Sequence, residues 1–399
     1  MKNSIKILFW AVFFIAALIG CSESPGDLGT DILKDDFGQD VVVVKDFSTS
    51  DTPVDQTSEV FAGPDTIATG SRGRVLLGKL DNINSKFLVK FNTTLPDSVL
   101  VPLKDNKLSV LSAKLEIIPE IIVGKEDMNS FNFEAFELAD KINIDIKKDD
   151  QINTVNGNFL SNIVSTDTII TADIDKDIIS EWLKEEHGDS TANYGALFSP
   201  GVSNNVVRIY SSILVDGTYN MRISYIVKKT EEWTDTLTYF PQVTVNIADG
   251  NLPNYSSDEM AVQGGVPSRA NYWFNKEQLP QEIAVNKATL EFFVNEESSI
   301  LRKTSLDTLE LNFYTNAAKD TLDFGRGTTL LLRDKDNNSF KGDATQFIQR
   351  MIDRDYSYGF RIKALNEHNN VSKIILKNHL VSDPALKPKL TIKYSQKNK

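Results

Sequence analysis

Five sequence landmarks occur twice along the chain in the same order, and this duplication constrains the fold more than any other feature. The first is an apolar segment that leads into Phe-Asn and then Leu-Pro, in FLVKFNTTLP (87–96) and again in NYWFNKEQLP (271–280). The second is LSAKLEIIPE (111–120), repeated as NKATLEFFVN (286–295). Its alternation of apolar and polar residues predicts a strand with one face in a core.

The third landmark has a helical period. Apolar residues recur at i, i+1, i+4 and i+5 in DIISEWLKE (177–185) and in QFIQRMIDR (346–354), which predicts one short amphipathic helix in each copy. A Tyr-Gly turn and a final alternating strand complete the copies: NYGALFS (193–199) with YNMRISYIV (219–227), and SYGFRIK (357–363) with KPKLTIKYS (387–395).

Short alternating strands separated by turns, with one helix in each copy, predict a mainly β protein. We expect two tandem β-sandwich, jelly-roll-like domains, each with one short helix, over residues 41–229 and 237–396. The charged stretch KKTEEWTDT (228–236) would then link them, with Trp233 in the linker or at an interface.

The chain begins with a targeting signal. Lysines precede the apolar run ILFWAVFFIAALI (7–19), which is shorter than the roughly 20 residues of a membrane-spanning helix, so residues 1–20 are predicted to be a secretory signal peptide. Residues 21–40 have the composition of a flexible tether. Cys21 is the one cysteine in the sequence and therefore has no intrachain disulfide partner.

The stretch LIGC (18–21) resembles the bacterial lipobox. The resemblance implies a diacylglycerol on the Cys21 thiol, cleavage before it and an acylated amino terminus, and several acyl chains together hold a protein stably at a membrane. Ser22 stands where an Asp would favour the inner membrane, so the outer membrane of a bacterial envelope is the expected location. Either leaflet of that membrane is compatible with these residues.

The landmarks together resemble DNRLRE modules, which are β-sandwiches related to carbohydrate-binding modules. With the lipobox, DLGTDIL (27–33) and VQGGVPSRANYWF (262–274), the chain is also similar to an uncharacterised family of Bacteroidota envelope lipoproteins. The resemblance implies a fold and an address, and it brings no assigned activity with it.

Charge and motifs narrow the function classes. The sequence has 55 acidic against 43 basic residues and no basic cluster, which argues against a nucleic-acid partner. Its three histidines lack the spacing of a zinc pair, and no nucleophile elbow is present. We therefore predict no catalytic residue.

Two acidic loops resemble calcium-binding loops in part. DIDKDIISEWLK (173–184) has Ile178 where an EF-hand loop needs glycine and Lys184 where it needs glutamate. DKDNN (334–338), with Asp334 and Asp336, also lacks the glycine. We predict no cofactor, with a bound calcium at either loop as the alternative.

Sugar binding requires an exposed aromatic ring for the apolar face of a pyranose. If Phe274 points into the core, alternation directs Tyr272 inward and Trp273 outward, which makes Trp273 the candidate ligand-binding residue. The alternative is that Trp273 covers the seam between domains or packs beneath a loop.

These observations predict a non-catalytic outer-membrane or cell-surface lipoprotein that binds or scaffolds at the envelope, with a polysaccharide as the first candidate ligand. A structural or accessory subunit that docks on a larger envelope protein complex is the alternative. A polysaccharide-acting enzyme is the third candidate.

Overall fold

The computed structural model describes most of the chain beyond residue 42. The described residues are 43–396 without the segments 64–72, 82, 93–94, 125–130, 147–149, 156, 167, 189–192, 203–204, 213, 216–217, 231–232, 303–306, 317, 320–321, 323–327 and 354–357. The expected signal peptide, Cys21 and the expected tether over residues 21–40 lie outside this range.

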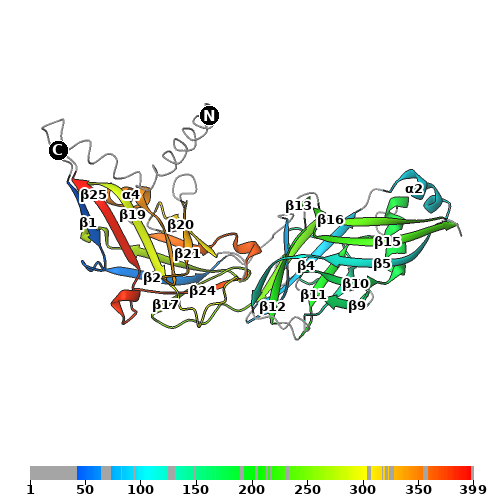
Figure 1. The fold of residues 1–399 in the computed structure, drawn as a ribbon, viewed down its shortest axis with the longest axis horizontal. Helices are drawn as coiled ribbons and strands as arrows, with labels where there is room; N and C mark the ends of the chain where they lie inside the picture. Colours follow the sequence, from blue (N-terminus) through cyan, green and yellow to red (C-terminus); the bar gives the residue numbers. More distant parts are fainter. Residues whose placement is uncertain are drawn as a thin grey trace, which may run out of the picture.

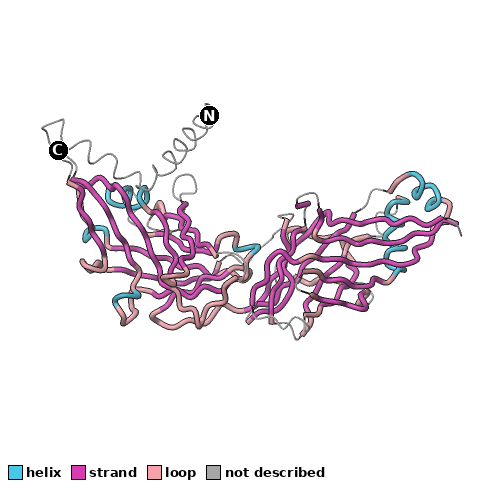
Figure 2. Tube along the Cα trace, viewed as in Figure 1, coloured by secondary structure: helices cyan, strands magenta, loops and turns pink. Residues whose placement is uncertain are grey.

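The protein is mainly β and consists of two antiparallel β-sandwich units that lie end to end (Figures 1 and 2). Among the residues that the structure describes, helix is confined to a few short segments (Figure 2). We call the part made of residues 74–250 unit 1, and the part made of residues 43–62 and 259–396 unit 2. The expected mainly β fold with two sandwiches is confirmed.

Unit 1 is one continuous stretch of chain. Its elements are β3 (Arg74–Leu80), β4 (Ile83–Asn92), α2 (Asp97–Lys104), β5 (Ser109–Ile117), β6 (Pro119–Gly124), β7 (Phe133–Leu138), β8 (Thr154–Val155), β9 (Leu160–Ser165), β10 (Ile170–Ile174), α3 (Lys176–Trp182), the 3-10 turn η1 (Leu183–His187), β11 (Ala196–Pro200), β12 (Val206–Ser211), β13 (Leu214–Val215), β14 (Thr218–Tyr219), β15 (Met221–Thr230) and β16 (Trp233–Gly250). Its strands run in the order β6-β12-β3-β4-β16-β15-β5-β10-β9, and β11 joins β4 to β7 and β8.

Unit 2 combines the first two strands of the described chain with its last third. Its elements are β1 (Val44–Ser48), β2 (Gln56–Ala62), β17 (Glu259–Gln263), β18 (Ser268–Phe274), η2 (Lys276–Gln278), β19 (Ile283–Phe293), β20 (Thr308–Phe313), β21 (Thr328–Asp334), β22 (Ser339–Asp343), α4 (Thr345–Asp353), β23 (Phe360–Ala364), η3 (Glu367–Asn369), β24 (Lys373–Lys377), η4 (Pro384–Leu386) and β25 (Lys389–Gln396). The strand order is β1-β25-β19-β22-β21-β20-β23-β18-β17-β24, with β2 on β18.

The two predicted amphipathic helices are α3 and α4, and both turn their apolar stripes inward. Trp182 of α3 is fully buried and stacks near Phe91, while Phe347 and Ile348 of α4 enter the core of unit 2. The side chain of Asp175 caps α3 by accepting a hydrogen bond from the Asp177 backbone N–H. Unit 1 also has a helix that was not expected, α2, whose sequence is interrupted by Pro102.

The Tyr-Gly turns have a specific steric reason. Gly195 and Gly359 both have positive φ, at 104° and 86°. A Cβ on Gly195 would lie 2.5 Å from the Val89 carbonyl oxygen, and a Cβ on Gly359 would lie 2.6 Å from that of Tyr272. Val89 and Tyr272 occupy equivalent places in β4 and β18, so each turn packs against the same point of its unit and admits no side chain.

The strand pairing does not follow the expected division at residues 41–229 and 237–396. β1 pairs with β25, so that Val44 lies opposite Ser395, and β2 pairs with β18 (Figure 1). The segment expected to link the domains instead contributes the end of β15 and the first part of β16, and β16 pairs with β15 and then with β4. Trp233 accordingly packs against the core of unit 1.

The reason for this arrangement is local. β15 ends at residue 230 and β16 begins at residue 233, so the two form a hairpin, whose short loop costs little closure entropy. β16 thereby fills the position beside the closing strand of unit 1. The equivalent position in unit 2, beside β25 and β18, is filled by β1 and β2. Unit 1 is thus inserted into unit 2, and the two copies are related by a circular permutation.

Val54 provides a test of this assignment. It lies between β1 and β2, is 7% exposed and belongs to the core of unit 2. Val54→Ala removes buried methyl groups and is expected to destabilise unit 2 by about 2 kcal/mol. Hydrogen exchange should accelerate in β25 and β18, whereas the exposed control Thr52→Ala should leave exchange unchanged. Accelerated exchange in β5 and β15 instead would contradict the assignment.

The glycine turns give a second expectation. Gly359→Ala forces a Cβ against backbone at a positive φ and should cost about 3 kcal/mol in urea unfolding. Gly157→Ala, where no atom lies within 4 Å of the added Cβ, should change stability by about 0.5 kcal/mol or less. Equal effects of the two substitutions would remove the steric explanation.

Candidate functional site

The two units meet at a buried apolar cluster that forms the centre of the seam between them. Val371 contributes from unit 2, and partly buried Val266 and Ile300 of the same unit pack against the cluster. The members from unit 1 are Leu76, Leu80, Ile83, Ile121, Val123, Val207 and Ile209. Burial of apolar surface therefore holds the units together here.

Polar contacts extend the seam. The Nζ of Lys373 lies 2.6 Å from the Oδ2 of Asp81, which joins β24 of unit 2 to the β3–β4 turn of unit 1. Val123 of β6 and Arg302 form an isolated antiparallel bridge between the units. Burial lowers the pKa of Arg302, while Asp307 acts to raise it.

A cleft of about 610 Å³ opens at this seam. It is lined by Leu80, Asp81, Gly124, Asn205, Asn254, Glu297, Ser298, Ser299, Ile300, Leu301 and Lys373. Its volume lies within the range of small-ligand sites. Amide, hydroxyl, carboxylate and ammonium groups from both units therefore face one hollow, beside three aliphatic side chains.

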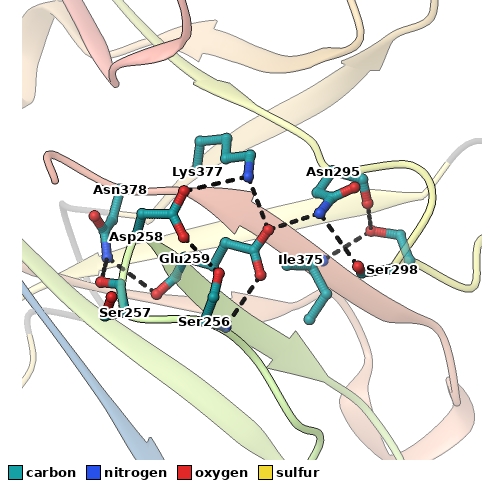
Figure 3. Close-up of polar contacts among 10 residues, drawn as sticks. Ser256, Ser257, Asp258, Glu259, Asn295, Ser298, Ile375, Lys377 and Asn378 are labelled. Atoms are coloured by element: carbon teal, nitrogen blue, oxygen red, sulfur yellow. Dashed lines mark hydrogen bonds and ion pairs between the residues drawn. The ribbon is translucent and has the colours of Figure 1, made fainter. Parts of the chain in front are cut away.

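A polar network behind one wall of the cleft fixes the 295–301 loop. Glu259, which is 6% exposed, is its centre, as Figure 3 shows. Its carboxylate accepts hydrogen bonds from Asn295 Nδ2 at 2.6 Å, from Lys377 Nζ at 2.9 Å and from the Ser256 backbone N–H at 3.2 Å. Three donors converge on one buried carboxylate, and both of its oxygens accept hydrogen bonds.

The network reaches the cleft through Asn295. The Nδ2 of Asn295 also donates to the Oγ of Ser298, which lines the cleft, at 3.2 Å. The Ser299 hydroxyl donates to the Asn295 carbonyl at 2.6 Å and accepts from the Ile375 N–H at 2.9 Å. Glu259 thus acts as a positioning residue for the cleft wall.

The protonation of Glu259 follows from these contacts. Burial by itself would raise the pKa of Glu259, but the hydrogen bonds from Asn295, Lys377 and Ser256 outweigh it and lower the pKa to about 2. Burial likewise would lower the pKa of Lys377, yet Glu259 and Asp258 raise it. Both groups are charged at neutral pH, and the pair is an ionic brace.

Trp273 points away from the core, as alternation predicted. Tyr272 and Phe274 on either side of it are buried, whereas Trp273 is partly exposed. The Nζ of Lys319 lies 3.7 Å from the centroid of its ring, a cation–π contact that occupies one ring face. Trp273 does not line the seam cleft, so the sequence candidate and the cleft are separate features.

The acidic loop with Asp334 and Asp336 has a structural use. Asp334 accepts hydrogen bonds from the backbone N–H groups of Asp336 and Asn337 and from the Asn337 side chain. The Asn337 side chain, followed by these N–H groups, lowers the pKa of Asp334. Among the described residues, no group of three or more His, Cys, Asp or Glu is placed to hold a metal ion.

Two further observations concern location and chemistry. In the part of the chain that the structure describes, no helix has the length and apolar character to cross a membrane. His379 is half-buried, and its Nδ1 lies 3.4 Å from the Ser58 Oγ. Burial, followed by the charge of Lys387, lowers the pKa of His379.

No protein-family model, curated protein or solved structure matches this chain. The resemblance to envelope lipoproteins and carbohydrate-binding modules therefore stays a prediction from the motifs.

The pKa of Glu259 gives a pH test. A folded-state pKa below the unfolded value stabilises the fold above pH 4.5, and this stabilisation is lost as the pH falls from about 4.5 towards about 2. The unfolding free energy of Glu259→Gln should therefore fall less over this interval than that of the wild type. Glu297→Gln, an exposed change in the same loop, is the control and should keep the wild-type slope. Identical slopes for all three proteins would contradict the brace.

Proposed function

We propose that the chain is a non-catalytic lipoprotein of the bacterial envelope that binds a glycan in the seam cleft. The observation that carries the proposal is the cleft itself, in which hydroxyl-pairing groups and aliphatic surface from both units face one hollow. Fold class alone does not lead to this function.

The chemistry of the lining suits a sugar. Asn205 and Asn254 are exposed and offer amide groups that both donate and accept, which matches the dual character of a sugar hydroxyl. Leu80, Ile300 and Leu301 offer apolar contact for the C–H groups of a ring. Asp81 is already paired with Lys373, which favours a binding role for this carboxylate over an acid–base role.

The predicted lipid anchor on Cys21 would hold such a site away from the membrane surface. Under the proposal the lipid is on Cys21, and the chain enters the fold at β1, in unit 2. Unit 2 would then be the unit nearest the membrane, and unit 1 would extend beyond it.

One observation favours the second candidate, an accessory subunit that docks on a larger envelope complex. Leu330 and Leu332 are 44% and 55% exposed and lie two residues apart on β21, so they share one outward face. Such a pair suits a protein contact more than a sugar.

A binding screen separates the sites. The soluble protein, residues 22–399, is tested against a panel of polysaccharides by calorimetry together with Asn254→Ala, Trp273→Ala and Leu332→Ser. Loss of hydrogen bonds in the cleft should weaken glycan binding by about tenfold in Asn254→Ala. The other two variants should bind as the wild type does.

The alternatives have distinct outcomes. Loss of binding in Trp273→Ala alone would move the site to the outer face of β18. Absence of binding to every glycan, with an envelope protein captured by the wild type and lost in Leu332→Ser, would replace glycan binding with the docking function.

A further inference from the structure

Residues 43–62 are held in unit 2 by non-covalent contacts. The strands that they pair with lie far from them in the sequence. β1 pairs with β25 over five residues, from Val44 opposite Ser395 to Ser48 opposite Thr391, and β2 pairs with β18 over seven. Unit 1 lies between this segment and its partners in the sequence. We call residues 43–62 the donor segment.

Side chains of the donor segment complete the core and polar contacts of unit 2. Val54 is buried there, and Phe47 and Val60 pack against the same core. The Asp55 N–H donates to Gln278 Oε1 at 2.6 Å, and the Gln278 side chain donates to Asp55 Oδ2 at 2.8 Å. The segment thus occupies a specific place beside β18 and β25, with a fixed register.

The corresponding place in unit 1 is filled differently. β16 belongs to a hairpin with β15, whose two-residue connection keeps both strands in the same copy of the chain. The donor segment has no such neighbour, because β2 is followed by residues 63–73 and then by β3 of unit 1. Eleven residues reach about 36 Å when extended, which is more than the width of a small domain.

We propose that the donor segment is exchangeable and that unit 2 accepts it from a second copy of the chain, so that two copies form a strand-exchanged dimer. Each contact described above is the same whether the segment comes from its own chain or from the partner, so reciprocal exchange preserves them all. The balance between monomer and exchanged dimer then depends on the protein concentration relative to the effective concentration of the segment within its own chain. This inference does not depend on the glycan-binding proposal.

Exposed cross-strand neighbours supply the test. Asp46 of β1 lies opposite Lys393 of β25, and both are exposed. In the soluble protein, residues 22–399, which lacks Cys21, the single variants Asp46→Cys and Lys393→Cys are each unable to close an intrachain disulfide. The two are mixed, partly unfolded in urea, refolded together at high protein concentration and oxidised.

A matched control comes from the hairpin of unit 1. Ile226 of β15 lies opposite Thr236 of β16, and both are exposed. The variants Ile226→Cys and Thr236→Cys are mixed and treated in the same way. Exchange predicts about tenfold more disulfide between positions 46 and 393 of different chains than between positions 226 and 236, measured by mass spectrometry of the dimer band.

The double variants complete the design. Asp46→Cys with Lys393→Cys in one chain should give covalent monomer at low concentration and covalent dimer increasingly at high concentration. Ile226→Cys with Thr236→Cys should stay monomeric throughout. Equal yields from the two mixtures, together with a wholly monomeric 46–393 double variant at every concentration, would overturn the proposal.

Discussion

Unit 2 depends on the pairing of the donor segment with β18 and β25. Without residues 43–62, two strand edges would be open and the core around Val54 would be exposed to water. The pairing also determines the architecture. The first strands of the folded chain pair with strands of its last third, so unit 1 is an insertion in unit 2. A tandem arrangement of two independent domains would place no such constraint on the chain.

The seam extends this dependence to the candidate site. Units that are connected twice, once before β3 and once after β16, meet along an apolar cluster and enclose the cleft at its edge. The Glu259 network stabilises the loop that forms one wall of the cleft. A buried charge with three donors thus helps to determine the shape of the exposed cleft wall. Removing a donor would leave a buried carboxylate incompletely paired, which is costly.

Sequence periodicity predicted much of the fold and little of the site. Alternation located the strands around Leu115 and Leu290, and the helical stripe located Trp182 and Phe347. All four are core residues in the structure. The outward direction of Trp273 was also predicted, because it depends on its two neighbours alone. The Lys319 contact that covers the ring was not, since it comes from a distant turn.

What the sequence did not predict is set by pairing between distant segments. The expected domain bounds of 41–229 placed the first strands in unit 1, because those strands are close to unit 1 in the sequence and a strand pattern does not specify its partner. The cleft is built from Asp81, Asn205, Ser298 and Lys373, which share no motif and come together through the seam. Glu259 likewise has no sequence feature that distinguishes it from the other acidic residues, because its donors are brought to it by the fold.

Chemical cross-linking of native lysines tests the central claim most directly. Lys45 of β1 lies opposite Tyr394 of β25, one residue along the strand from Lys393. Lys228 and Lys229 lie on the closing strand of unit 1. The account predicts a Lys45–Lys393 cross-link in the dilute wild-type protein. A cross-link from Lys45 to Lys228 or Lys229, with none to Lys393, would show that the first strand completes unit 1 and would contradict it.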